Sequence, residues 1–231
     1  MRKERESLLE ISAKIGEYYK IIISGGIMVE YVDRTKEISS DLKACKTAFD
    51  EVNIPWVIID GIVLGYARYK DIMPWDTDLD VGIFSEITNE QWGFLLLSLQ
   101  KHGFKKVVEV NDFAAFSRET ILDLHVFHKE GDFYVCYPKP HKHRYIERAK
   151  WFNEPQIVDF IGDRYPMPNH VEDFVSAHYG SDWKTNIVKN HDEYLVDARG
   201  SLDHLAWING NSRCNKNGDL WPKILTIEEH L

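Results

Sequence analysis

Three aspartates are the residues of this chain whose type and spacing point most directly to chemistry. Asp76, Asp78 and Asp80 stand at alternate positions and run into the apolar residues Val81 and Ile83. Alternate side chains of an extended chain share a face, so the carboxylates of Asp78 and Asp80 are expected to point the same way. Neighbouring carboxylates repel unless a cation lies between them. The spacing therefore predicts a strand with a Mg²⁺ (or Mn²⁺) site, and Asp76 is an additional candidate ligand.

A fourth aspartate is expected to join this site. Asp123 lies in the otherwise apolar segment 121–127, where an unpaired charge would be costly. Either a basic group pairs with it, or it is a third metal-binding or catalytic acid. The second interpretation is favoured because this segment is expected to lie beside Asp78 and Asp80. His125 would share the face of Asp123, and we expect it to be a core histidine or a support for a ligand.

A calcium loop of the EF-hand kind does not fit the same acids. Asp76, Asp78 and Asp80 would occupy its first, third and fifth positions. The sixth position requires glycine and holds Val81, and the twelfth requires glutamate and holds Ile87. The EF-hand interpretation therefore fails at two positions.

Alternating helix and strand patterns predict the elements that position these acids. Apolar residues at three- and four-residue steps predict helices over 36–53 and 89–101. A third helix is predicted over 171–179, because Asn169 is a candidate N-cap and Glu172, three residues later, would complete a capping box. Strands are expected at 56–59, 104–110, 113–117, 121–127 and 133–137, with a hairpin formed by 157–160 and 164–167. This order indicates a domain that contains both helices and strands.

The chain is expected to have three parts. Residues 1–35 are predicted as an N-terminal helical segment, 36–185 as the main domain, and 186–231 as a C-terminal extension, a helical appendage packed on the same domain. The three cysteines have no Cys-x-x-Cys spacing and are expected to be free thiols in a reducing compartment. No apolar run approaches the roughly 20 residues of a membrane span, and the charged start does not match a signal peptide. We therefore expect a cytoplasmic protein.

Composition narrows the classes of partner. Of 231 residues, 44% are hydrophobic and 28% charged, which is typical of a folded soluble domain. The net charge of −9 argues against broad nucleic-acid binding, although a local basic patch is compatible with it. Such a patch occurs at residues 139–148, which include Lys142 and Arg144. These two residues are either part of a solvated face or phosphate contacts beside the acids.

The stretch around the acids resembles the LicD/fukutin family of the nucleotidyltransferase fold. Members carry Gly-x-Leu-Leu-Gly-x-x-Arg and then Ile-Pro-Trp-Asp-Asp-Asp-x-Asp, and this chain has 61–65, Arg68 and 72–82 in the same order. Val63 and Thr77 depart from the pattern, but neither removes an acid expected to hold metal. A weaker second match follows, with Pro166-Met-Pro and then His178-Tyr-Gly-Ser-Asp-Trp183. The resemblance covers roughly residues 40–185.

This resemblance implies an α/β (α+β) nucleotidyltransferase fold, with a mixed sheet flanked by helices and a C-terminal helical appendage. It also implies an activity and partners. It implies a metal-dependent transferase that moves a phospho-alcohol, such as phosphocholine or ribitol phosphate, from a CDP-linked donor to a hydroxyl of a sugar or glycan acceptor. By position, Asp78 and Asp80 match the family's pair of acids, and Asp123 matches the third. Gly61 and Gly65 would let the backbone approach donor phosphate at a helix start, where amide groups favour anions. Arg68 would offer a forked donor to phosphate, unless it is a surface or carboxylate-paired arginine.

Two other functions stay open on the sequence. The same fold could transfer a nucleotide to RNA, protein or a small molecule. Alternatively, the chain could be a catalytically inactive member of the fold that only binds a ligand. The intact set of Asp78, Asp80 and Asp123 argues against the inactive form.

Overall fold

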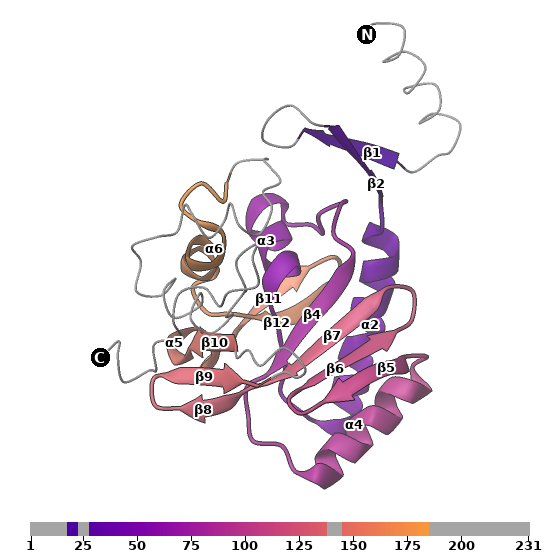
Figure 1. Cartoon of the computed structure of the whole chain (residues 1–231), viewed down its shortest axis with the longest axis vertical. Helices are drawn as coiled ribbons and strands as arrows, with labels where there is room; N and C mark the ends of the chain where they lie inside the picture. The colour runs from indigo at the N-terminus through magenta and orange to yellow at the C-terminus, as the bar shows by residue number, and fades with distance from the viewer. Residues whose placement is uncertain (1–17, 23–27, 138–144, 185–231) are drawn as a thin grey trace, which may run out of the picture.

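A mixed five-stranded sheet positions the acids. The computed structural model describes residues 18–22, 28–137 and 145–184 (Figure 1). The strand order is β3-β4-β7-β6-β5; β4 and β7 are parallel, and the other neighbouring pairs are antiparallel. The strands are β3 (Val57–Ile58), β4 (Asp78–Ile83), β5 (Lys105–Val110), β6 (Phe113–Ser117) and β7 (Ile121–Val126). The predicted strands and the mixed sheet are therefore confirmed.

Two amphipathic helices, α2 (Thr35–Val52) and α4 (Asn89–Lys101), pack against each other. The apolar stripe of α2 is buried, as its three- and four-residue spacing predicts, except that Val52 at its end is only partly buried. Thr88 begins α4 with a capping box in which the Thr88 hydroxyl accepts from the backbone N–H of Gln91. The Ser98 hydroxyl of α4 donates to the carbonyl of Ala48 in α2 at 3.0 Å. Both helices agree with the prediction.

The two faces of the sheet differ sharply in burial. Leu79 and Val81 of β4 and Leu122 and Leu124 of β7 are 0% exposed. The residues that alternate with them on the same strands are Asp78, Asp80 and Asp123, which are only partly buried. Because alternate side chains point to opposite faces, one face of the sheet is the hydrophobic core and the other carries the acids.

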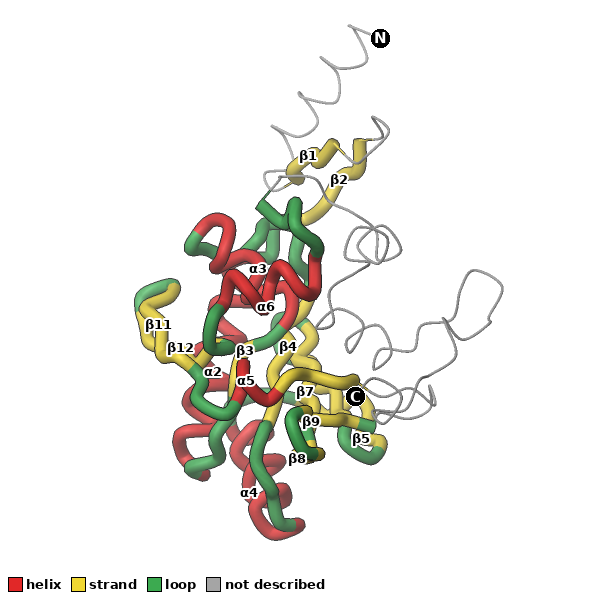
Figure 2. Tube along the Cα trace, turned by 90° about the vertical axis from the view of Figure 1, so that its left-hand side faces the viewer, coloured by secondary structure: helices red, strands yellow, loops and turns green. Residues whose placement is uncertain are grey.

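Shorter elements complete the domain around one end of the sheet (Figures 1 and 2). Helix α3 (Asp60–Tyr69) contacts α6 (Val171–Tyr179) and β4. The predicted hairpin is present as β11 (Gln156–Phe160) and β12 (Asp163–Met167). The remaining elements are β8 (His128–Glu130), β9 (Phe133–Cys136), β10 (Tyr145–Arg148) and α5 (Ala149–Phe152). Of these four, only β9 was expected.

Two local expectations are wrong. The segment predicted as helical up to residue 35 contains an antiparallel hairpin, β1 (Tyr18–Ile22) and β2 (Met28–Val32); residues 1–17 lie outside the described residues. Paired strands rich in Tyr, Ile and Val suit the β conformation, which explains the difference. Asn169 does not cap α6, because its side-chain oxygen accepts from the backbone N–H of His170, and His170 is the N-cap residue. Helix α6 itself is confirmed and ends at Gly180.

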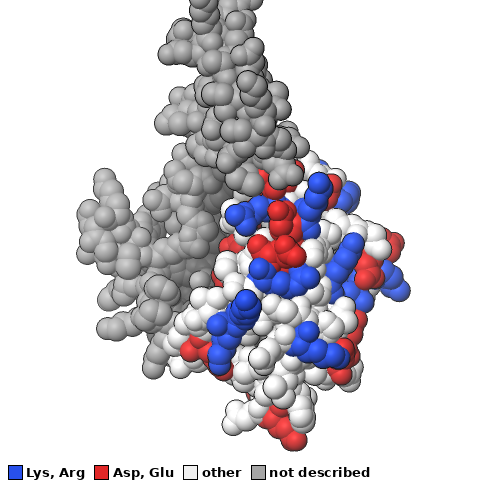
Figure 3. All heavy atoms as spheres, turned by 90° about the vertical axis from the view of Figure 1, so that its right-hand side faces the viewer, with Lys and Arg blue, Asp and Glu red and all other residues white. Residues whose placement is uncertain are grey.

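Residues 186–231 lie outside the described residues, so the predicted appendage is untested. Among the residues that are described, no helix is long and apolar enough to cross a membrane. On the face drawn in Figure 3, basic and acidic side chains are interspersed.

Candidate active site

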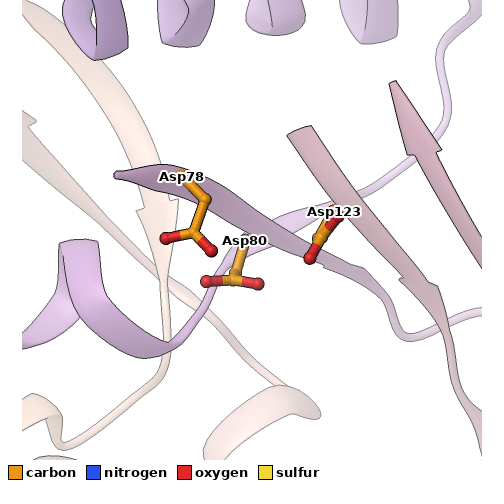
Figure 4. A group of neighbouring side chains, drawn as sticks. All are labelled: Asp78, Asp80 and Asp123. Carbon is orange, nitrogen blue, oxygen red and sulfur yellow. The ribbon is translucent and has the colours of Figure 1, made fainter. Parts of the chain in front are cut away.

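Three carboxylates meet on the open face of the sheet. Asp78 and Asp80 extend from β4, and Asp123 extends from β7, directly opposite Asp80 in the parallel register (Figure 4). One ligand oxygen of each residue lies within 4.8 Å of the other two. No Lys or Arg in the described part of the chain pairs with Asp123, which argues against the ion-pair alternative. The predicted grouping of Asp78, Asp80 and Asp123 is therefore present, and we call these residues the acid triad.

The electrostatics of the acid triad favour a bound cation. Burial, followed by the charges of Asp78 and Asp60, raises the pKa of Asp123 to about 6. The pKa of Asp80 is raised well above its ordinary value by burial and then by the surrounding carboxylates, and burial also raises the pKa of Asp78. Burial disfavours ionisation of all three groups, and neighbouring carboxylates add to this effect for Asp80 and Asp123. A divalent cation with oxygen ligands would relieve this repulsion.

Asp76 borders the acid triad beside the start of α3. Burial and then Asp78 raise the pKa of Asp76 to about 7. Its Oδ1 accepts from the backbone N–H of Thr77 at 3.2 Å, whereas its buried Oδ2 has no hydrogen-bond partner within the described residues. A β-carbon added to Gly61 would lie 2.7 Å from that Oδ2. Gly61 is therefore required for the close approach of Asp76, and Oδ2 is available to a ligand.

Asp60 is a site residue that sequence reasoning missed. It begins α3 with a φ of 53°, a left-handed conformation that is uncommon outside glycine. Its charge helps to raise the pKa values of Asp76, Asp80 and Asp123, so it lies within electrostatic reach of all three. The predicted strand 56–59 ends directly before Asp60, and no role was predicted for this residue. The available signal was an acid directly before the glycine that opens a helix.

Gly65 and Arg68 are held by contacts inside the protein. A β-carbon on Gly65 would lie 2.7 Å from the carbonyl oxygen of Asp71 and 3.1 Å from the backbone nitrogen of Met73. The Arg68 Nε donates to the carbonyl of Trp183, and its Nη1 lies 3.9 Å from the Met73 sulfur. Both residues thus fix α3 against its neighbours. We therefore leave Gly65 and Arg68 out of the phosphate site proposed below.

His125 has the supporting position that was expected of it. It is 7% exposed, and its Nε2 lies 3.9 Å from Oδ1 of Asp80. Burial lowers the pKa of His125 to about 4, so the ring is neutral near pH 7. The rings of Phe113 and Tyr145 pack beside it, with centroid distances of 5.2 and 5.1 Å. His125 therefore borders the acid triad on the same face of the sheet.

Lys142 and Arg144, the expected phosphate contacts of the basic segment, lie outside the described residues. Their role stays a prediction.

The part of the chain that carries the acid triad resembles known proteins. The family described as "LicD/FKTN/FKRP, nucleotidyltransferase domain" matches residues 53–170, which is more than half of the chain. The ribitol-5-phosphate transferase FKTN of Mus musculus is 24% identical over 164 residues, covering 67% of this chain and 34% of that protein. FKTN of Homo sapiens is 23% identical over 172 residues, covering 69% and 36%. The chain thus spans about a third of the length of these relatives.

A further relative and two solved structures are more distant. The Rickettsia typhi protein RT0683 is 35% identical over 85 residues, covering 36% of this chain and 26% of that protein. ANT(2")-Ia in complex with adenylyl-2"-tobramycin has a TM-score of 0.46 at 16% identity, covering 71% of this chain and 87% of that chain. JHP933 from Helicobacter pylori has a TM-score of 0.35 at 11% identity, covering 75% and 70%. From the family match, the chain belongs to the LicD/FKTN/FKRP family of nucleotidyltransferase domains.

Proposed function

We propose that this protein is a metal-dependent transferase that moves a phospho-alcohol, of the phosphocholine or polyol-phosphate type, from a CDP-linked donor to a hydroxyl of a sugar or glycan. The observation that carries the proposal is the acid triad, with one oxygen of each carboxylate within 4.8 Å of the others. Membership of the family supports the reaction class, as do relatives named ribitol-5-phosphate transferases.

The acid triad fits a resident Mg²⁺ (or Mn²⁺). Asp78, Asp80 and Asp123 would hold the ion, and the unpartnered Oδ2 of Asp76 is a further candidate ligand. When bound, such an ion neutralises negative charge on phosphate oxygens. Hard carboxylate oxygens without a paired Lys or Arg in the described residues are the donor set that these ions prefer.

The chemistry left to the chain is positioning and proton transfer. The acceptor oxygen forms a bond to the phosphorus that carries the alcohol, and the bond from that phosphorus to the bridging oxygen breaks, so that CMP leaves. The acceptor hydroxyl loses a proton in the same reaction. Asp123, on β7 opposite Asp80, would either complete the binding of the ion or take that proton.

The start of α3 is the proposed location of the donor phosphates. The first backbone N–H groups of a helix have no partner within the helix and favour anions. Gly61 occupies this turn, beside Asp76 at the edge of the acid triad. The donor would therefore lie between the start of α3 and the triad.

The test is a donor panel offered to the purified protein. CDP-ribitol and CDP-choline are incubated with Mg²⁺ and a mixture of saccharides, and release of CMP is measured; CTP and ATP are run in parallel. Metal-dependent CMP release from a CDP-alcohol is expected. Covalent transfer of a nucleotidyl group from CTP or ATP would instead assign the protein to nucleotide transfer.

The same experiments test the alternative that the protein binds a ligand but has no catalytic activity. If Mg²⁺ shows no binding and Asp78→Ala changes no measured rate, the chain is a ligand-binding member of the family and not an enzyme.

A further inference from the structure

The open face of the sheet extends well beyond the acid triad. The strand registers place Ile121 opposite Asp78, Ala115 opposite Asp123, and Ser117 opposite Ile121. Further along the same face, Phe113 lies opposite His125 and Val108 opposite Ala115. Five residues of β5, β6 and β7 thus form one continuous surface beside the triad. We call this surface the side shelf: Val108, Phe113, Ala115, Ser117 and Ile121.

Four of the five side-shelf residues are at least partly exposed, and Ala115, in the middle of β6, is 7% exposed. Ile121 is 39% exposed and Val108 is 38% exposed, whereas Leu122, the next residue after Ile121, is 0% exposed. Phe113 and Ser117 are partly exposed. Phe113 packs beside His125, whereas Ile121 and Val108 leave apolar surface exposed beside the acid triad. Exposed apolar patches commonly mark binding sites.

The chemistry of the side shelf selects its occupant. Its members carry aliphatic groups, one aromatic ring and one hydroxyl, and none is charged. Lys105, opposite Ser117 on the edge strand, is the nearest basic residue in these registers, and it lies across β6 from β7. A diphosphate would gain little on such a surface. The C–H face of an uncharged sugar would gain apolar contact, and its hydroxyls could bond to Ser117.

The side shelf also lies in the right direction for an acceptor. Donor phosphates are proposed at the start of α3, beside Asp76 and Asp78, and the side shelf begins across β7 at Ile121 and Ala115. In-line transfer requires the attacking and leaving oxygens on opposite sides of the phosphorus. We propose that the side shelf binds the acceptor as an uncharged saccharide, with its reacting hydroxyl directed at the acid triad. This inference rests on the proposed function.

Methyl NMR tests the location of the acceptor directly. The full chain, labelled at Ile, Leu and Val methyl groups, is titrated with methyl glycosides of glucose, galactose, mannose and N-acetylglucosamine in the presence of Mg²⁺ and CMP. We expect at least one glycoside to shift the methyl signals of Ile121 and Val108. Leu97 of α4, which is 63% exposed and lies outside the shelf, is the control and should not shift.

A second titration uses CDP with Mg²⁺ as the donor probe. It should shift Ile62, which directly follows Gly61 in α3, and leave Val108 unchanged. The inference is overturned if no glycoside shifts the shelf methyl groups, or if CDP shifts Val108 and not Ile62.

Variants separate specific binding from general apolar contact. The double variant Val108→Ala with Ile121→Ala removes apolar surface without adding charge. We expect it to bind the glycoside roughly tenfold more weakly than the unaltered chain does. Leu97→Ala, the matched control, should bind as the unaltered chain does. Equal binding by all three proteins would contradict the inference.

Failure of the inference is distinguishable from failure of the proposed function. Release of CMP from CDP-ribitol into water, without any saccharide, depends on the donor site alone. If that release occurs while no glycoside shifts the methyl signals of the side shelf, only the proposed location of the acceptor is wrong.

Discussion

Asp41 and the acid triad are carboxylates of the same domain with opposite surroundings. Asp41 of α2 is 0% exposed and accepts from the Arg118 Nη1 at 2.7 Å, from the Thr120 backbone N–H at 2.7 Å and from the Thr120 hydroxyl at 2.8 Å. The Glu119 N–H contributes a longer bond of 3.3 Å. Asp41 thereby ties α2 to the turn that precedes β7. Its charge has enough donors to be held without a ligand.

The acid triad has the opposite surroundings. The neighbours that raise the pKa of Asp80, after burial, are the carboxylates of Asp60, Asp78, Asp123 and Asp76. The buried Oδ2 of Asp76 has no partner in the described part of the chain. A buried charge with its own donors stabilises the fold, whereas facing carboxylates destabilise it until a cation binds. The difference separates structural from functional aspartates without reference to any relative.

The largest expected effect is on turnover. Asp80→Asn should lower kcat/KM for CMP release on the order of 10³-fold or more, because loss of a metal ligand removes several kcal/mol of charge stabilisation. Its thermal stability without metal should not fall, since a repelling charge is removed. Asp159→Asn, an equivalent change at an exposed position of β11, is the matched control and should keep its rate. A near-normal rate in Asp80→Asn would show that Asp80 is not a ligand of the catalytic metal.

The next largest effect is expected on the stability of the fold, when Asp41 is replaced. Asp41→Ala leaves the Arg118 guanidinium and the Thr120 N–H without their acceptor, so we expect a loss of about 3–5 kcal/mol in the free energy of unfolding. Urea denaturation measures this. Asp41→Asn keeps an acceptor oxygen and should lose less. A loss below about 1 kcal/mol in Asp41→Ala would show that the hydrogen bonds of Asp41 do not stabilise the domain as proposed.

The pH dependence should also differ between free and metal-bound protein. The pKa values of Asp76 and Asp123 are raised to about 7 and about 6 from 3.8. The folded metal-free chain therefore holds these protons longer than the unfolded chain as pH rises. Their contribution to stability is full below pH 3.8 and is lost as pH rises through about 7.

Metal binding competes with the same protons. The rise in Tm on adding Mg²⁺ should therefore grow between about pH 5 and about pH 8. Scanning calorimetry with and without Mg²⁺ checks both trends. A Mg²⁺-dependent rise in Tm that is larger at pH 5 than at pH 8 would contradict the assignment.

The smallest expected effect comes from a glycine. Gly61→Ala places a β-carbon 2.7 Å from Oδ2 of Asp76, so the carboxylate must shift. We expect metal affinity roughly tenfold weaker, as for other changes that displace a metal ligand indirectly. Gly93→Ala in α4 is the control, because its β-carbon would meet no atom within 4 Å. Equal affinities in the two variants would show that Asp76 has no part in binding.

The sequence predicted those parts of the fold and site that follow from periodicity. Helices α2 and α4 follow from apolar spacing, and the acid triad follows from alternation in β4 together with one acid in the apolar strand β7. The hairpin β1–β2 was missed because the apolar residues in segment 18–32 are compatible with either a helix or a strand. Pairing between the two strands decides the conformation, and local sequence does not show that pairing. Asp60 was missed because its left-handed φ leaves no trace in spacing. Packing of Gly65 against 71–73 depends on tertiary contact, which periodicity does not encode.

Binding of Mn²⁺, followed by electron paramagnetic resonance, tests the central claim most directly. The unaltered chain should bind Mn²⁺, Asp80→Asn should lose that binding, and Asp159→Asn should keep it. Mg²⁺ should displace the bound Mn²⁺. Equal Mn²⁺ binding by the unaltered chain and Asp80→Asn would contradict a metal centre at the acid triad.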